Sequence, residues 1–310
     1  MQSAENIHVR PSWPTIADSF QVVLGVHQGF LTSISFNLLR SVAGPVLDLG
    51  LRSKVAVVPA ASKGIGLGVA KVLAIEGCKV VISSRDQDSI SKARDAIVKE
   101  TGNKDVYSVK ADLTAKADVD FLIDEATRKF GIVDILAYNT GPPKPGTFAD
   151  LNDADWEQGV RLLLMSAVWL TKQVIPGMVQ KKWGRLIYIA SSTLRQPVPS
   201  LVLSNTVRLS LAGLSKSIAL EYGSKGITSN GIMQGHILTD RQRQVAQDVS
   251  SRTGKGLDET MKQMLQDVPV GRYGLPEEVG YLVAFLASEK ASYVNGTMLA
   301  IDGGLIRSVF

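Results

Sequence analysis

The stretch from Lys54 to Gly68, KVAVVPAASKGIGLG, constrains the fold more than any other part of the sequence. Its apolar run Val55–Val58 predicts a strand that is buried on both faces, as in a parallel sheet. Small residues follow directly and let the backbone approach a ligand closely before a helix begins at about Gly66. The free N–H groups at the start of that helix would face the pyrophosphate of a dinucleotide. The pattern predicts a dinucleotide site, and a tight turn without a ligand is the alternative interpretation.

Strands and helices alternate at short intervals after this loop, which predicts parallel strands joined by right-handed crossovers. We therefore expect an α/β fold, a single Rossmann-type doubly wound parallel sheet of about seven strands with helices on both faces. The further strands are expected at Lys79–Ser83, Tyr107–Leu113, Val133–Tyr138, Arg185–Ala190, Gly226–Met233 and Met298–Asp302, and the two longest helices at Asp155–Met178 and Val207–Gly223.

The amino-terminal residues 1–50 differ in character from the rest of the 310-residue chain, so we divide it into an extension at 1–50 and a Rossmann-type domain at 51–310. The segment Phe20–Val46 is mildly apolar, but polar residues and glycines interrupt it too often for a membrane-spanning helix. A secretory signal would begin with basic residues, whereas Met1–Ser19 carries two acidic residues. We interpret the extension as a tail, packed or disordered, or as a start site assigned too far upstream; a targeting peptide is the weaker alternative.

The net charge of +5 would permit anionic partners, but the basic residues are scattered and form no run. We therefore expect no nucleic-acid partner and no membrane partner, and we expect a cytoplasmic location. The single cysteine, Cys78, excludes an internal disulfide. No metal site is predicted.

The chain from about Leu51 to Leu305 resembles the short-chain dehydrogenase/reductase family, of the type that includes 3-oxoacyl-acyl-carrier-protein reductases. The loop Ala60–Gly66, AASKGIG, is similar to the family's glycine motif, Asp112 with Leu113 to its adenine-ring motif, and Tyr138–Gly141, YNTG, to its N-N-A-G. The carboxyl-terminal part, Pro269–Gly304, is similar to the family's closing pattern almost throughout. The resemblance implies cofactor contacts at Ala60, Ser62, Lys63, Gly64, Ile65, Gly66, Ser84, Arg85, Asp112, Leu113, Asn139, Gly141 and Ile237.

The catalytic positions depart from the family's pattern of an Asn, a Ser and a Tyr-x-x-x-Lys. Ser191 matches the serine, but Ser204 stands at the tyrosine's place and Arg208 at the lysine's place, and Leu163 stands at the asparagine's place. In the family the tyrosine passes a proton to the carbonyl oxygen and the lysine lowers its pKa. The resemblance therefore implies catalytic roles for Ser191, Ser204 and Arg208, in an altered site.

Chemistry limits what these replacements can do. A serine hydroxyl is far less acidic than a tyrosine of pKa about 10, and arginine stays protonated because its pKa exceeds about 12. Losing a positioned general acid typically removes about 10²- to 10⁴-fold in rate. Ser191 and Ser204 can still hydrogen-bond a carbonyl, and Arg208 can supply fixed positive charge to a developing alkoxide or to the nicotinamide ribose.

Three other side chains near the predicted crevice, Tyr138, Tyr188 and His236, are possible substitute acids, although a packing role is the favoured interpretation of each. The alternative function is a nucleotide-binding protein of the same fold that is catalytically inactive or regulatory.

The predicted cofactor is NADP, with NAD the less favoured choice. Ser84 and Arg85 end the second strand without the carboxylate that would hold an NAD 2′-hydroxyl, and Lys63 adds a second cation in the glycine loop. The alternative is that both cations are simply solvated. Pro59 and Ala60 replace the family's threonine and first glycine, which would reduce nucleotide affinity without abolishing it.

The substrate side is predicted from the resemblance alone. The segment Gly235–Val268, with an amphipathic helix near Leu257–Leu265, would close over a small-molecule or acyl-carrier-linked carbonyl substrate. Arg241 and Arg243 could meet an anionic substrate, and solvated arginines are the favoured alternative. A homo-oligomer, dimer or tetramer, is expected through the two longest helices and the carboxyl-terminal segment.

Overall fold

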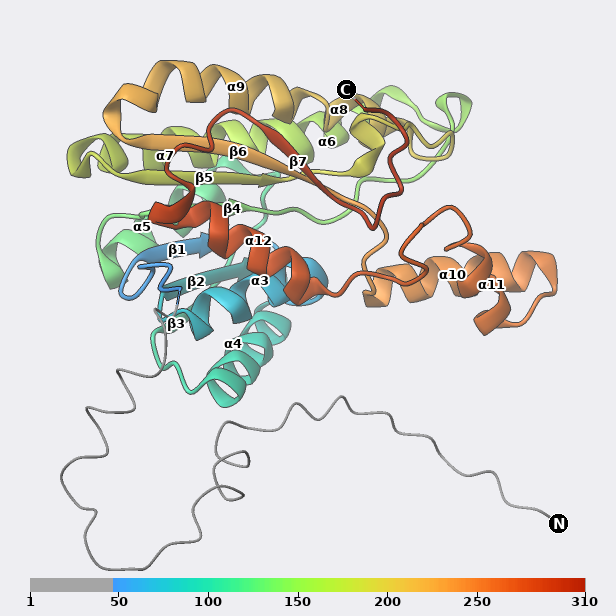
Figure 1. Ribbon diagram of the computed structural model, residues 1–310, viewed down its shortest axis with the longest axis horizontal. Helices are drawn as coiled ribbons and strands as arrows, with labels where there is room; N and C mark the ends of the chain where they lie inside the picture. The colour runs from blue at the N-terminus through green and yellow to red at the C-terminus, as the bar shows by residue number, and fades with distance from the viewer. Residues whose placement is uncertain (1–46, 310) are drawn as a thin grey trace, which may run out of the picture. The chain divides into compact units, whose positions relative to one another are not determined.

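The computed structural model describes residues 47–309, so the predictions for the amino-terminal extension lie outside the described residues except at its end. From Leu49 onward the chain forms one compact unit around a seven-stranded parallel sheet of order β3-β2-β1-β4-β5-β6-β7 (Figure 1). The predicted fold class is confirmed. The strands are β1 (Val55–Val58), β2 (Lys79–Ser84), β3 (Val106–Lys110), β4 (Ile135–Tyr138), β5 (Gly184–Ile189), β6 (Ile227–Gln234) and β7 (Met298–Ile301).

Helices cover both faces of this sheet because most of its strands are buried on both sides. The α-helices are α3 (Gly64–Ile75), α4 (Gln87–Thr101), α5 (Lys116–Phe130), α6 (Asp153–Val160), α7 (Ser166–Lys181), α8 (Val202–Val207), α9 (Ser210–Tyr222), α10 (Asp240–Thr253), α11 (Leu257–Gln263) and α12 (Pro276–Ala287). Buried side chains of α3, α4 and α12 form one apolar core with the sheet, and those of α5, α7 and α9 form the core on the other face.

The order of the strands reverses between β1 and β4. From β1 the chain moves outward through β2 and β3, then returns to place β4 on the opposite side of β1. Ligands of open parallel sheets bind beyond the carboxyl ends of the strands at such a reversal. The fold therefore brings the glycine loop after β1 and the Asn139 loop after β4 to one crevice.

The expected long helix Asp155–Met178 contains a π-helical segment, η2 (Arg161–Met165), between α6 and α7. The hydroxyl of Tyr138 on β4 donates toward the carbonyl oxygens of Leu162 and Leu163 at this segment. A π-helical turn hydrogen-bonds residues five apart in place of four, which interrupts the regular α-helical pattern of hydrogen bonds. The Tyr138 hydroxyl is a donor to carbonyl oxygens at this interruption. Among the described residues, Asp153–Lys181 is the one helical run that is long and apolar enough to cross a membrane. The core helices of soluble proteins can have the same length and composition. Buried side chains of this run pack against the sheet.

Two other helix predictions need correction. The expected helix Val207–Gly223 is found as α9, which begins later, at Ser210; Val207 ends the separate short helix α8, and Arg208 and Leu209 between the two keep helical backbone angles. The segment expected to close over the substrate contains α10 in addition to the predicted α11. Thr239 is the N-cap of α10, and its side chain accepts a hydrogen bond from the Gln242 amide.

Candidate functional site

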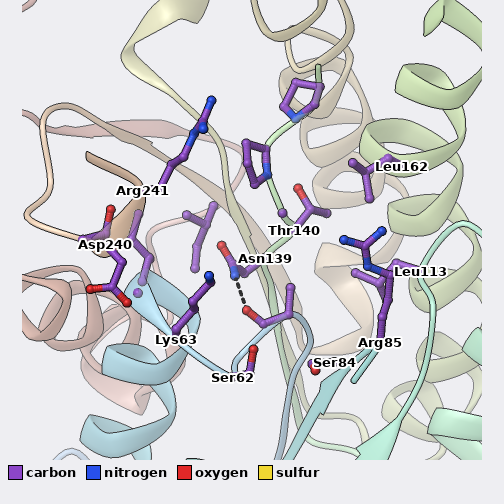
Figure 2. A pocket seen from close by; sticks show the side chains of 18 of the residues that line it. Ser62, Lys63, Ser84, Arg85, Leu113, Asn139, Thr140, Leu162, Asp240 and Arg241 are labelled. Atoms are coloured by element: carbon purple, nitrogen blue, oxygen red, sulfur yellow. Dashed lines mark hydrogen bonds between the residues drawn. The ribbon is translucent and has the colours of Figure 1, made fainter. Parts of the chain in front are cut away.

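The glycine loop is held by close backbone packing. Ala60 and Gly64 both adopt positive φ, at 51° and 60°, so the chain turns sharply before α3 begins at Gly64 rather than at Gly66. A β-carbon on Gly66 would lie 2.5 Å from the Ala60 carbonyl oxygen and 2.8 Å from Asn139 Nδ2. The Asn139 amide in turn donates to the Ala60 carbonyl oxygen at 3.1 Å (Figure 2). Gly66 is therefore required by packing beneath the loop.

A cleft of about 880 Å³ opens beside this loop at the carboxyl ends of the strands. All of the predicted cofactor-binding residues except Gly66 line it: Ala60, Ser62, Lys63, Gly64, Ile65, Ser84, Arg85, Asp112, Leu113, Asn139, Gly141 and Ile237. Residues from the ends of β1 to β4 and from the segment after β6 thus meet in one cavity. Its glycine-loop wall includes the start of α3, and the N–H groups of a helix's first turn have no partner within the helix and suit the pyrophosphate of a dinucleotide.

The end of the cleft at β2 and β3 carries one cation, Arg85, and two carboxylates, Asp86 and Asp112. Arg85 is exposed, and both it and Leu113 line the cleft (Figure 2). Asp86, which the sequence prediction passed over, also lines the cleft, but its carboxylate accepts the Ser89 amide at 2.8 Å as the N-cap of α4. That hydrogen bond lowers the pKa of the Asp86 carboxyl. Its capping position before a helix was the signal that could have been read from the sequence.

Asp112 lies where the resemblance placed it, on the cleft wall just after β3. One of its carboxylate oxygens accepts from the amide of Thr114 at 2.9 Å and from the Thr114 hydroxyl at 2.8 Å. These contacts fix the turn and hold the side chain in place.

Arg208 is the one predicted catalytic residue that lines the cleft. Its guanidinium connects the ends of β4 and β5, with Nη2 3.3 Å from Thr140 Oγ1 and 3.5 Å from the Gly141 carbonyl oxygen, and Nη1 3.5 Å from the Ile189 carbonyl oxygen. Only 9% of the residue is exposed, and this burial lowers the pKa of the guanidinium. A positive charge thus lies inside the crevice, across the reversal point from the glycine loop.

The two predicted serines are buried next to the cleft but are not part of its wall. Ser191 Oγ accepts a hydrogen bond from the Thr193 amide at 3.2 Å, and Ser204 Oγ lies 3.3 Å from Thr193 Oγ1. Thr193 therefore links the two predicted serines, a role that the sequence prediction did not assign. Its place two residues after Ser191, at the end of β5, was the available signal.

The proposed substitute acids have packing roles. The Tyr138 hydroxyl is 2.7 Å from Ser166 Oγ, and the Tyr188 hydroxyl is 2.8 Å from Thr171 Oγ1. Burial strongly raises the pKa of both phenols. His236 packs edge-on against Tyr273, and burial lowers the pKa of its imidazole. None of the three lies on the wall of the described cleft.

The start of α10 covers part of the cleft. Asp240, Arg241, Gln242 and Gln244 line it, and Figure 2 shows Asp240 and Arg241 on the side of the glycine loop. Arg243 does not line the cleft. Sequence reasoning missed the two glutamines because it placed no helix there.

Comparison with known proteins agrees with this geometry. A family model described as enoyl-(acyl carrier protein) reductase matches residues 60–306. The 3-oxoacyl-[acyl-carrier-protein] reductase FabG of Escherichia coli (strain K12) is 30% identical over 257 residues, which cover 83% of this chain and 99% of FabG. The chain belongs to the short-chain dehydrogenase/reductase family. Membership confirms the predicted family and the predicted class, an NAD(P)-dependent oxidoreductase acting on carbonyl or alcohol groups.

Two solved short-chain dehydrogenase/reductase structures are informative. The L-sorbose reductase of Gluconobacter frateurii, complexed with NADPH and L-sorbose, matches with a TM-score of 0.82 and 30% identity over 85% of this chain and 100% of its own. An NADPH-bound short chain oxidoreductase of Pseudomonas aeruginosa PAO1, described as containing an atypical catalytic center, matches with a TM-score of 0.75 and 25% identity over 83% and 100%. Both hold NADPH, which agrees with the predicted cofactor.

Proposed function

We propose that this chain is an NADPH-dependent reductase of carbonyl compounds, including 3-oxoacyl-like substrates, with an altered active site. The observation that carries the proposal is one cleft whose wall holds both the predicted nucleotide contacts and Arg208. NADPH, when bound, supplies the hydride for such a reduction. The relatives that hold NADPH support this cofactor.

Two groups of cleft residues suit the two anionic parts of NADP. The amides at the start of α3, with Lys63 beside them, suit the pyrophosphate. Arg85 suits a 2′-phosphate because its guanidinium is exposed on the cleft wall directly after Ser84, while the Asp86 carboxylate that follows it stays ionised and caps α4 through one oxygen. A site built in this way would favour NADP over NAD.

At the part of the cleft next to Arg208, we propose that a fixed positive charge stabilises the reacting carbonyl oxygen. The described lining of the cleft contains no tyrosine and no histidine, so a positioned aromatic acid is absent from it. Arg208 lies in a mostly buried position where a positive charge stabilises a developing oxyanion more strongly than it would in water. Ser191 and Ser204 contact Thr193 behind the wall, so in this proposal the proton comes from solvent.

The test combines purified protein with NADPH and a panel of ketones, aldehydes and β-ketoacyl thioesters, including acyl-carrier-linked ones. Cofactor-dependent turnover is expected with at least one class. If no compound on the panel is reduced above background while NADPH binds, the reductase proposal is wrong.

A second candidate is a nucleotide-binding protein without turnover, serving as a sensor or as a subunit of a mixed oligomer. It is favoured by one observation, that Ser191 and Ser204 do not line the cleft. Calorimetry would then find NADPH binding without reduction of any substrate, and the discovery of a good substrate would exclude this candidate.

Self-association and a cytoplasmic location stay predictions. A homo-oligomer formed through the expected contact helices would cover the exposed side chains of Val160 on α6 and Leu220 on α9. Light scattering after size exclusion measures it, and a monomer at all concentrations would contradict it.

A further inference from the structure

The segment that carries α10 and α11 is attached to the rest of the domain mainly at its ends. Among the described residues, each of the two helices buries a single side chain. At the base of the segment the Leu238 amide donates to the Gly274 carbonyl oxygen at 2.8 Å, and the Gly274 amide donates to the His236 carbonyl oxygen at 2.9 Å. We call residues 235–274 the lid, because the start of α10 covers part of the cleft. The position of the lid therefore depends on contacts at its base.

The turn that follows β7 contacts both ends of the lid. The Gly235 amide donates to the Ile301 carbonyl oxygen at 3.1 Å, and a β-carbon on Gly235 would lie 2.8 Å from the Asp302 Cα. Near the other end of the lid, the Val270 amide donates to the Gly303 carbonyl oxygen at 3.1 Å. Gly303 has a positive φ of 64°, which glycine adopts without strain. The lid thus begins and ends on the same turn.

The carboxyl-terminal tail continues from this turn and contacts the lid again. The Asp302 carboxylate accepts hydrogen bonds from the Gly304 amide at 3.0 Å and from the Ile306 amide at 2.7 Å, which fixes the direction of the tail. The Arg307 guanidinium then lies 2.7 Å from a carboxylate oxygen of Asp267 in the lid. Figure 1 shows the tail, in red, running from the end of β7 to the carboxyl terminus near α8.

The same arginine also contacts the loop between β5 and α8. Its backbone amide donates to the side-chain oxygen of Gln196 in this loop at 3.3 Å. The loop is joined in turn to the loop after β4, because the Gly146 amide donates to the Ser200 carbonyl oxygen at 2.8 Å. Pro142 in the loop after β4 lines the cleft. Arg307 therefore connects the lid with the loops that follow β4 and β5.

The ion pair between Arg307 and Asp267 is weak enough to open and close. The two side chains are 73% and 53% exposed. An exposed ion pair of this kind changes an equilibrium by about two- to fivefold. Surface segments with few buried contacts open locally at a small cost in free energy, so a change of that size alters the fraction of open lid measurably.

We propose that residues 302–307 form a strap that holds the lid over the cleft, with Arg307 as its positioning residue. The strap ties Asp267 of the lid to Gln196 of the loop after β5. When the ion pair opens, the lid keeps its contacts with the turn after β7 and loses its connection to that loop. The effect on substrate binding rests on the proposed reductase function, whereas the effect on lid motion does not.

The experiment measures amide hydrogen exchange in the full-length protein by mass spectrometry. R307E and D267R each reverse one charge of the pair, and the double variant R307E/D267R restores the pair with its signs exchanged. We expect each single variant to speed exchange in the lid about two- to fivefold, and the double variant to return it close to the original rate. A chain that ends at Ile306 loses both Arg307 contacts, so exchange should rise further in the lid and should also rise in residues 195–201.

R94E is the matched control. Arg94 forms an exposed ion pair with Asp95 on α4, which belongs to neither the lid nor the strap, so exchange in the lid should not change. Where the protein reduces a substrate, R307E should raise the KM for that substrate about two- to fivefold and leave NADPH affinity unchanged. A general loss of structure would instead change both quantities.

Three results would overturn the proposal. These are unchanged lid exchange in R307E and in the shortened chain, an increase that the double variant does not reverse, and an equal increase in R94E. If R307E does not fold, D267R and the shortened chain test the same connection. The exchange measurements need no turnover, so a protein that reduces nothing can still confirm the strap. Turnover together with unchanged lid exchange in the variants would support the reductase function and refute the strap.

Discussion

Replacing Ala60 with glycine tests whether the altered phosphate loop is strained. Ala60 has a φ of 51°, in the left-handed region, where an L-residue with a β-carbon costs about 1–2 kcal/mol. Glycine removes that cost but adds about 0.5–1 kcal/mol of unfolded-state entropy and loses a partly buried methyl group. The net change in the free energy of unfolding is therefore small, near zero or slightly stabilising.

The matched control is Ala61→Gly, at the next residue. Ala61 is fully buried and does not have a positive φ, so its replacement has the same entropy cost, loses a buried methyl group and relieves no strain. Urea unfolding should find A60G more stable than A61G by at least about 1–2 kcal/mol, the cost of a left-handed alanine. For a domain of this size each kcal/mol corresponds to about 2–4 °C in the unfolding temperature.

Equal destabilisation by A60G and A61G would refute the reasoning, because the left-handed conformation would then carry no measurable cost. Equal m-values in the two variants are needed for this comparison, since a change in m would report a change in the denatured state.

Three further predictions concern the cofactor site and acid stability. Gly66→Ala would place a β-carbon 2.5 Å from the Ala60 carbonyl oxygen, so we expect stability to fall by about 1–3 kcal/mol and NADPH binding to be lost in fluorescence titrations. Arg85→Asp should weaken binding of NADPH more than that of NADH, and equal effects on the two titrations would contradict a 2′-phosphate contact. The Arg272 guanidinium and the Leu275 amide lower the pKa of Glu278 to about 2, so its contribution to stability is full above its unfolded pKa and is lost as pH falls toward about 2. In Glu278→Gln the free energy of unfolding should therefore fall less steeply as the pH is lowered below the unfolded pKa of a glutamate. The same slope in the variant and the unmodified protein would contradict a stabilising role for this carboxylate.

The strands could be predicted because their burial leaves a local signal. β1 was expected at Val55–Val58 and is found there, since four apolar residues in a row suit a strand with helices on both faces. Helix α10 leaves no such signal. Only Ala246 of that helix is buried, so the apolar periodicity that identifies most helices is absent from its sequence.

The cleft could be predicted from topology, because the carboxyl ends of neighbouring parallel strands meet at one edge. The direction of individual side chains could not. Ser191 and Ser204 follow the family's spacing, but both hydroxyls face Thr193. That orientation depends on how α8 packs, which the spacing of residues along the chain does not contain.

The helix that carries Ser204 packs against the segment that carries Leu163. Leu163 forms a buried apolar cluster with Leu203 and Val207, which joins α8 to the π-helical segment. Ser204 is buried between Leu203 and Val207 in the sequence, and Arg208, one turn later, contacts Thr140 in the loop after β4. A tyrosine introduced at Ser204 would add volume inside this packed region, at a typical cost of about 1–3 kcal/mol, without opening a path to the cleft. A tyrosine at Ser204 alone would therefore not rebuild the family's proton donor.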